Sequence, residues 1–227
     1  MRQIVLDTET TGLNPEMGHR VIEIGAVEVI NRRSTGRTFH LYLNPEREID
    51  AGAVEVHGLT SDFLADKPHF EDIRDDFLAF IAESELVIHN APFDVGFLNA
   101  ELRRMDSGDN LARHCHSVLD TLKLAKELHP GQKNNLDALC RRYEVDNSGR
   151  AYHGALLDAQ LLADVYLAMT RGQESLAIES FLTPPPQSRQ LGVQTDIKVL
   201  PASATELAEH EAYLDKMAKD CGRPLEW

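Results

Sequence analysis

The chain begins with a short apolar run, residues 2 to 6, that ends directly in Asp7-Thr8-Glu9. Branched apolar residues followed by Gly, Asn and Pro predict a buried strand that ends near residues 8 to 10. Because side chains alternate along a strand, Asp7 and Glu9 share one face and Thr8 lies on the other. Two neighbouring carboxylates repel each other unless a cation lies between them, and their oxygens suit Mg²⁺ or Mn²⁺. The alternative is a solvated strand end that carries two surface acids.

Another acidic residue, Asp94, follows a second short apolar run at residues 86 to 88. Apolar residues at helical spacing follow it, so we expect a helix that Asn90 caps and that has Pro92 in its first turn. Asp94 would lie in that turn, where a carboxylate is favourable beside unpaired backbone N–H groups. A helix-capping acid and a cation ligand are both compatible with this position.

The third segment is His153 and Asp158, which precede and enter an apolar-periodic helix expected over 154–171. Gly154 would leave His153 on the approaching loop, while Asp158 would project from the early helix. A free histidine has a pKa of about 6.5, so it can accept a proton at neutral pH. These two residues suit a general base and a metal ligand, and a surface loop is the alternative.

Together the three segments resemble the exonuclease motifs of the DEDDh family of 3′→5′ exonucleases. The matching stretches are Asp7-Thr8-Glu9-Thr10-Thr11-Gly12, His89-Asn90-Ala91-Pro92-Phe93-Asp94 and His153-x4-Asp158. Their order and spacing fit the family over about residues 1 to 171, and the resemblance is nearest to its bacterial proofreading members. It implies a ribonuclease H-like α/β fold with a mixed central sheet flanked by helices.

The resemblance also implies a mechanism in which two divalent cations, Mg²⁺ or Mn²⁺, assist hydrolysis of the terminal phosphodiester. Asp7, Glu9, Asp94 and Asp158 would hold the metals, and His153 would be the base. The expected activity is the proofreading removal of nucleoside monophosphates from single-stranded or frayed 3′ DNA ends. The expected setting is a bacterial replicative DNA polymerase of which the chain is a subunit.

Substrate contacts follow from the same resemblance. His57 would contact the terminal nucleotide, although Gly52 stands where close relatives can carry an acidic residue. Phe93 would pack against a base, with a core aromatic as the alternative. The other implied contacts are Asp7, Thr8, Glu9, Thr10, Gly12 and Asp158.

Periodicity predicts strands at 2–8, 20–31, 36–43, 85–89 and 116–119, and helices at 69–83, 91–105, 121–128, 134–143 and 154–171. Hairpin-like strands come first and strand-helix alternation follows, which favours a mixed sheet. We therefore assign residues 1–172 to an exonuclease domain.

The remaining residues predict a tail. Residues 173–201 read as a linker that contains a proline run, and Gln173 to Ile178 is similar to peptides that bind sliding clamps. The end of the preceding helix is the alternative for that peptide. Residues 202–227 predict a helix with a Ser203-x-x-Glu206 capping box, which would bind the polymerase catalytic subunit with Trp227 as an anchor. The alternative is a helix packed on its own domain.

Composition bears on the expected location of the protein and on its binding to DNA. No apolar stretch approaches the ~20 residues that span a bilayer, and Cys115, Cys140 and Cys221 are few and odd in number, so we expect a cytoplasmic protein with free thiols. The net charge of −14 opposes binding to DNA. We therefore expect weak binding by the isolated chain and delivery of the DNA end by a partner.

Two rival functions stay open at this point. One is a stand-alone DEDDh exonuclease that trims RNA or short oligonucleotides, which would share the catalytic residues but would leave the tail without a role. The other is a noncatalytic scaffold whose carboxylates only cap helices and solvate strand ends.

Overall fold

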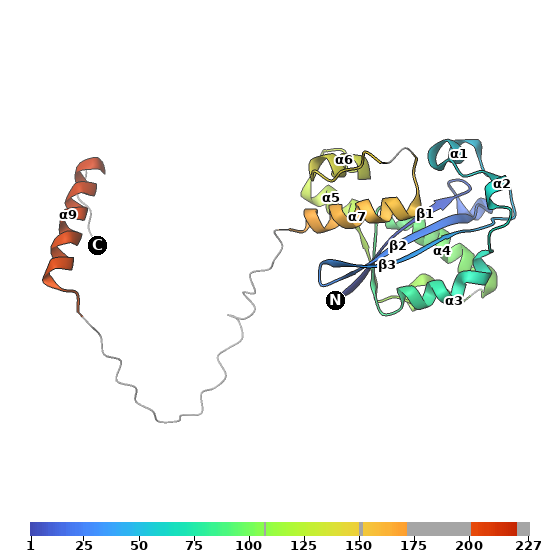
Figure 1. Cartoon of the computed structure of the whole chain (residues 1–227), viewed down its shortest axis with the longest axis horizontal. Coiled ribbons are helices and arrows are strands. Elements are labelled where there is room, and N and C mark those ends of the chain that lie inside the picture. The colour runs from blue at the N-terminus through green and yellow to red at the C-terminus, as the bar shows by residue number, and fades with distance from the viewer. Residues whose placement is uncertain (107, 150–151, 172–200, 222–227) are drawn as a thin grey trace, which may run out of the picture. The chain divides into compact units, whose positions relative to one another are not determined.

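A computed structural model describes residues 1–106, 108–149, 152–171 and 201–221 (Figure 1). Contacts divide the chain into two units, Met1–Leu176 and Ala177–Trp227, and each is described by itself.

In the described part of the first unit, five strands form one mixed sheet in the order β3-β2-β1-β4-β5. The strands are β1 Arg2–Thr10, β2 Val21–Ile30, β3 Arg33–Tyr42, β4 Glu85–Ile88 and β5 Ser117–Asp120. The pairs β1-β2 and β2-β3 are antiparallel, whereas β4 runs parallel to β1 and β5. Asn31 and Arg32 turn the chain between β2 and β3 with φ values of 49° and 63°, the left-handed conformations of a tight hairpin. The predicted mixed sheet is confirmed.

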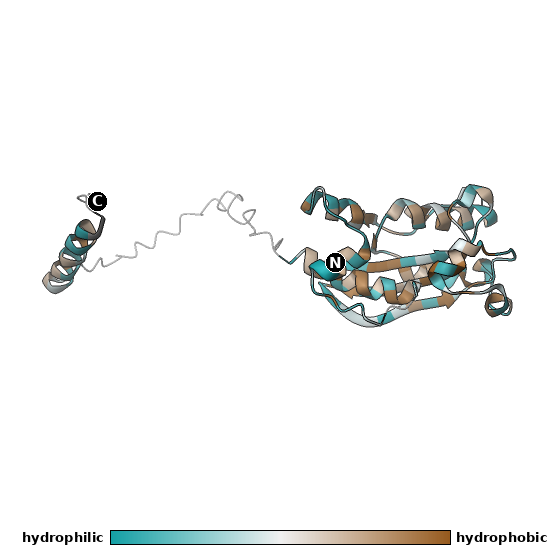
Figure 2. Ribbon diagram, turned by 90° about the horizontal axis from the view of Figure 1, so that it is seen from above, coloured by the Kyte–Doolittle hydropathy of each residue, from teal (hydrophilic) through white to brown (hydrophobic). Residues whose placement is uncertain are grey.

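Helices cover both faces of this sheet (Figure 1). They are α1 Ala51–His57, α2 Ser61–Leu64, α3 Phe70–Ile81, α4 Ala91–Met105, α5 Thr121–Leu128, α6 Leu136–Arg142 and α7 Ala155–Met169, with the short 3-10 turns η1 Pro15–Met17 and η2 Leu111–Arg113. Ile4 and Leu6 of β1 pack with α3 and α4, whereas Val5 packs with α5, α6 and α7. Figure 2 shows apolar residues gathered in the strands and the helices against them. The alternation of side chains along β1 therefore gives the unit two apolar layers.

All five predicted strands are confirmed, and so are the predicted helices, the first of which begins at residue 69. Their ends differ from the prediction by a few residues. The sequence did not predict α1, α2, η1 and η2. Elements of three or four residues, such as α2, η1 and η2, are too short to show a helical period, and α1 contains a glycine and two β-branched valines, which do not favour a helix. The predicted cap at Asn90 is wrong: Asn90 has φ 65° and its side chain makes no cap hydrogen bond. Its backbone N–H instead donates to Asp120 Oδ1 at 3.2 Å. Pro92 does lie in the first turn of α4.

The described part of the second unit is helix α9, Ala204–Cys221. Its predicted capping box is confirmed, since Ser203 N–H donates to Glu206 Oε2 at 2.7 Å and Glu206 N–H donates to Ser203 Oγ at 3.3 Å. The peptide Gln173 to Ile178, the linker around it and Trp227 lie outside the described residues. Among the described helices, none has the length and apolar character needed to cross a bilayer.

Candidate active site

The five residues predicted to be catalytic come together from four separate segments. Asp7, Glu9, Asp94, His153 and Asp158 all line one cavity of about 240 Å³, here called the acidic pocket. Strand β1 supplies two of them, α4 and α7 supply one each, and the loop before α7 supplies the histidine. Segments about 150 residues apart in the chain thus meet at the end of β1.

Within the acidic pocket, Glu9, His153 and Asp158 form a compact cluster. Each offers one ligand atom, and these atoms lie within 4.8 Å of one another. His153 Nδ1 lies 3.2 Å from Asp158 Oδ2, and the side chains of His153 and Asp158 are 46% and 4% exposed. Two carboxylates and an imidazole are donors that suit a divalent cation. In the part of the chain that the structure describes, this is the one such group of three or more residues.

Asp94 reaches the pocket from the other layer of the fold. Its Oδ1 accepts hydrogen bonds from Thr8 N–H at 3.1 Å and from Thr8 Oγ1 at 2.7 Å. Burial raises the pKa of Asp94 to about 7, against the opposing effect of the hydrogen bonds from Thr8. The predicted alternation along β1 explains this arrangement, since Thr8 faces α4 while Glu9 groups with Asp158 of α7. A cation in the pocket would offset the cost of a buried charge on Asp94.

Gly25 of β2 lets α7 approach the sheet closely enough to deliver Asp158. Gly25 pairs with Asp7 across the strands. A Cβ atom at this position would lie 2.1 Å from the backbone of Ala155 and Leu156 in the first turn of α7. Gly25 was not predicted to have a role. A glycine inside an apolar strand often marks a site where another backbone approaches closely, and this signal could have identified it.

The loop that carries His153 is attached to α1. His153 N–H donates to Val56 C=O at 3.1 Å. The Tyr152 ring lies over Gly58, where an added Cβ would meet it at 3.3 Å. Gly58 has φ +73°, a conformation that suits glycine at the end of a helix. The position of His153 is therefore linked to the end of α1.

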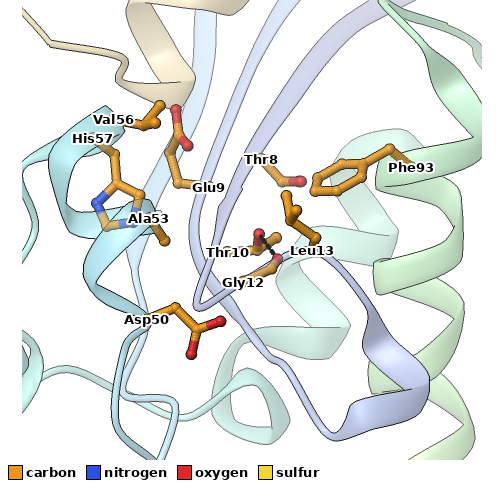
Figure 3. A pocket seen from close by; sticks show the side chains of 11 residues that line it. Thr8, Glu9, Thr10, Gly12, Leu13, Asp50, Ala53, Val56, His57 and Phe93 are labelled. Atoms are coloured by element: carbon orange, nitrogen blue, oxygen red, sulfur yellow. Dashed lines mark hydrogen bonds between the residues drawn. The ribbon is translucent and has the colours of Figure 1, made fainter.

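A second cavity of about 500 Å³, here called the side pocket (Figure 3), shares part of its lining with the acidic pocket. Both are lined by Thr8, Glu9 and Phe93. Figure 3 shows Phe93 and Leu13 on one side and His57 and Val56 on the other. The full lining is Thr8, Glu9, Thr10, Gly12, Leu13, Asp50, Gly52, Ala53, Val56, His57 and Phe93. All five residues predicted to contact only substrate, namely Thr8, Thr10, Gly12, His57 and Phe93, thus line this pocket.

His57 presents a buried nitrogen in the side pocket. Its Nδ1 accepts a hydrogen bond from Leu59 N–H at 3.0 Å, so the ring proton is on Nε2. Burial lowers the pKa of His57, which favours the neutral ring. Nε2 is buried, and an interaction with the backbone of Thr10 partly opposes the effect of burial on the pKa.

A buried ion pair supports the loop between β1 and β2. Arg20 Nε donates to both carboxylate oxygens of Glu101, at 2.8 and 3.0 Å, and both side chains are less than 9% exposed. His19 lies against Gly12, where a Cβ would approach its ring to 2.3 Å. Arg20, Glu101 and His19 were not singled out from the sequence, because nothing local distinguishes a buried charge from a surface one.

Comparison with known proteins identifies relatives along nearly the whole chain. The exonuclease family model RNase_T matches residues 4–166. The DNA polymerase III epsilon subunit of Salmonella typhimurium is 50% identical, with 99% of this chain and 96% of the relative covered. The same subunit is 48% identical in Escherichia coli K12, with 99% and 96% covered, and 46% identical in Rickettsia felis, with 96% and 98% covered.

Solved structures have the same fold. Exonuclease X in complex with 5′ overhanging duplex DNA has a TM-score of 0.60 at 26% identity and covers 75% of this chain and 92% of its own. The nuclease domain of 3′hExo, a DEDDh family member bound to rAMP, has a TM-score of 0.65 at 18% identity and covers 76% and 92%. These matches establish the ribonuclease H-like arrangement expected from the three motifs.

Proposed function

The chain belongs to the RNase_T exonuclease family and is a 3′→5′ exonuclease of the DNA polymerase III epsilon type, and from this premise we propose how its residues remove the terminal nucleotide. The convergence of the five predicted residues on one pocket is the observation that carries the proposal.

Asp7, Glu9 and Asp158 would hold two divalent cations, and Asp94 would complete the second cation site; all four line the acidic pocket. The donor set fits Mg²⁺ or Mn²⁺, because it is built mainly of carboxylate oxygens. When bound, the cations supply Lewis acidity that favours ionisation of the attacking water and offsets charge on the phosphate and the leaving 3′ oxygen.

His153 accepts the proton of the attacking water. Its ring is 46% exposed and its Nδ1 lies against Asp158, so Nε2 is the nitrogen that takes the proton. Asp158 orients the ring as well as binding metal. Thr8 holds Asp94 in the pocket through its two hydrogen bonds.

The terminal nucleotide lies in the side pocket. Phe93 and Val56 provide apolar walls for the base, and His57 contacts the sugar or base from the side of the pocket opposite Phe93. Thr10 Oγ1 donates to Gly12 C=O at 2.7 Å, which links the end of β1 to the loop that follows it (Figure 3). Cleavage releases a nucleoside monophosphate and leaves a new 3′ hydroxyl.

The polymerase catalytic subunit is the partner, and residues 202–227 bind it. The match to epsilon subunits covers 99% of the chain, tail included, and this supports a polymerase subunit over a stand-alone exonuclease. The peptide from Gln173 to Ile178 is proposed as a site for the sliding clamp. The cytoplasm, where bacterial DNA is replicated, is the proposed location.

Digestion of a 3′-mismatched primer tests this mechanism. We expect Mg²⁺-dependent release of mononucleotides that stops on chelation and is lost in a folded Asp158→Asn variant. His153→Gln should lower kcat by about 10²- to 10⁴-fold, as removal of a general base does. Retained hydrolysis in well-purified Asp158→Asn would contradict the metal assignment, and an unchanged kcat in His153→Gln would contradict the base.

A further inference from the structure

A strongly acidic chain needs a local surface that accepts the phosphates of DNA. We propose that the strand upstream of the terminal nucleotide leaves the acidic pocket across Asn90, Lys123, Lys133 and Asn135, here called the exit edge, and that this edge binds its phosphates. The inference rests on the proposed function, because it takes the scissile phosphate to lie in the acidic pocket.

The two pockets set the direction of the strand. Both pockets are lined by Thr8, Glu9 and Phe93. A terminal nucleotide in the side pocket therefore extends its scissile phosphate into the acidic pocket past these three residues. The rest of the strand must leave where the acidic pocket borders on solvent. Among the residues that line only the acidic pocket, the exposed ones are Asn90, Asn135 and His153.

Asn90 lies beside the first turn of α5. Its backbone N–H donates to Asp120 Oδ1 at 3.2 Å, and the same oxygen accepts from Leu122 N–H at 2.9 Å and Lys123 N–H at 3.3 Å. The exposed side chain of Lys123 therefore starts from a backbone held against the pocket rim.

Asn135 lies at the end of the loop between α5 and α6. It caps α6 by accepting a hydrogen bond from Ala138 N–H at 3.1 Å. The exposed Lys133 is two residues earlier. Arg142 fixes this loop, because its guanidinium donates to Lys133 C=O at 2.9 Å and to Asn134 Oδ1 at 3.0 Å. The second lysine of the edge is thus held near the rim as well.

The charge of this region is opposite to that of the chain. Residues 120–142 contain five lysines and arginines and three acidic residues, whereas the whole chain has a net charge of −14. Asn90 and Asn135 add amide groups that can donate to phosphate oxygens without charge. An edge of this composition beside the catalytic carboxylates suits a single strand whose phosphates follow one another out of the pocket.

The test compares two double variants that each lose two positive charges. Lys123→Gln/Lys133→Gln alters the exit edge, and Arg103→Gln/Arg104→Gln alters an exposed pair on α4 that lines a different cavity with Pro15 and Glu16. The substrates are a thymidine octamer and the p-nitrophenyl ester of thymidine 5′-monophosphate, which has no upstream phosphate and cannot reach the edge.

For the lysine variant, we expect kcat/KM for the octamer, divided by kcat/KM for the ester, to fall about tenfold at low salt. We also expect the slope of log(kcat/KM) for the octamer against log[salt] to flatten by about 1.4, or ~0.7 for each lost phosphate contact. The arginine variant should keep the ratio and the slope of the parent chain. Equal falls in both variants would overturn the exit edge in favour of overall charge, and an unchanged ratio in the lysine variant would overturn it directly.

Binding gives a readout that does not depend on hydrolysis. Fluorescence anisotropy of a labelled octamer in Ca²⁺ should show weaker binding by the lysine variant than by the arginine variant. That result would support the edge even if the parent chain hydrolysed neither substrate, an outcome that would overturn only the proposed function. Equal affinities for the two variants would overturn the edge.

Discussion

Asp94 shows how one side chain can belong to a pocket without sharing a face with its neighbours. Asp7 and Glu9 lie on the face of β1 that meets α7, whereas Asp94 belongs to α4 on the opposite face. Two hydrogen bonds from Thr8 hold the Asp94 carboxylate beside the end of β1. Thr8, which lies between Asp7 and Glu9, therefore positions the carboxylate of Asp94 in the pocket.

Asp109 is a structural carboxylate whose contribution should depend on pH. Hydrogen bonds from Arg74, at 2.8 Å, and from His114, at 2.7 Å, lower the pKa of Asp109 from 3.8 to about 2. A lowered pKa in the folded state contributes stability that is complete above the unfolded pKa and is lost as the pH falls. Asp109→Asn should reduce the free energy of unfolding at pH 7 by roughly 1 to 3 kcal/mol.

Urea unfolding at several pH values measures this effect. The difference between Asp109→Asn and the parent chain should shrink as the pH falls from about 4 toward 2, because Asp109 then loses its charge in both states. Asp75→Asn is the matched control, since Asp75 pairs with the same arginine but its side chain is 91% exposed, and it should cost at most about 1 kcal/mol. A difference independent of pH would contradict the ion-pair explanation.

At the scale of elements, the contact between β2 and α7 sets the depth of the active site. Gly25→Ala would place a Cβ 2.1 Å from the α7 backbone, so the helix must move away from the sheet. We expect a loss of roughly 1 to 3 kcal/mol or more in the free energy of unfolding, together with reduced kcat, because Asp158 moves with α7.

Gly96→Ala is the control for this prediction. Gly96 lies inside α4 and has nothing within 4 Å of an added Cβ. The same chemical change should stabilise the protein by about 0.5–1 kcal/mol through helix propensity. Equal effects of the two substitutions in urea unfolding would show that close packing at Gly25 is not the cause.

The attachment of the His153 loop to α1 gives a second prediction at this scale. Tyr152→Ala removes the ring that covers Gly58 and should lower kcat about tenfold with little change in KM, because His153 loses its position but the side pocket stays intact. Tyr152→Phe keeps the ring and should restore kcat. Steady-state kinetics on a single-stranded oligonucleotide separates these outcomes, and a change confined to KM would contradict a positioning role.

At the scale of the whole molecule, catalysis and assembly should be separable. Arg32 donates to Leu167 C=O and to Thr170 Oγ1, both at 2.8 Å, and so ties the last turn of α7 to the β2–β3 hairpin. A chain that ends at Arg171 keeps these contacts. It should retain hydrolysis of single strands and lose co-purification with the polymerase catalytic subunit.

A full-length control tests the tail helix itself. Leu207→Ser/Leu214→Ser alters two apolar residues seven apart, which lie on one side of α9. We expect this variant to hydrolyse single strands as the parent chain does and to co-purify weakly. If the chain that ends at Arg171 still co-purified fully with the polymerase catalytic subunit, the proposed role of the tail would be wrong.

Local pattern was enough to predict the strands and the longer helices, and the resemblance of three short segments to the DEDDh motifs singled out five residues that line the acidic pocket. The period of apolar residues is a property of neighbouring positions, and the three motifs are short enough to recognise in one sequence. That is why β1, α4 and α7 could be placed before their contacts were known.

Only the tertiary structure decided which layer supplies each acid, which backbone lies against Gly25, that α1 lines the side pocket and which part of the chain lies beside Asn90. Each of these depends on segments that are far apart in the chain and close in space, such as Gly25 with Ala155 or Asn90 with Asp120. Hydrophobic periodicity shows which face of an element is buried but not what it is buried against. The partner across each contact is fixed only when all the layers pack together.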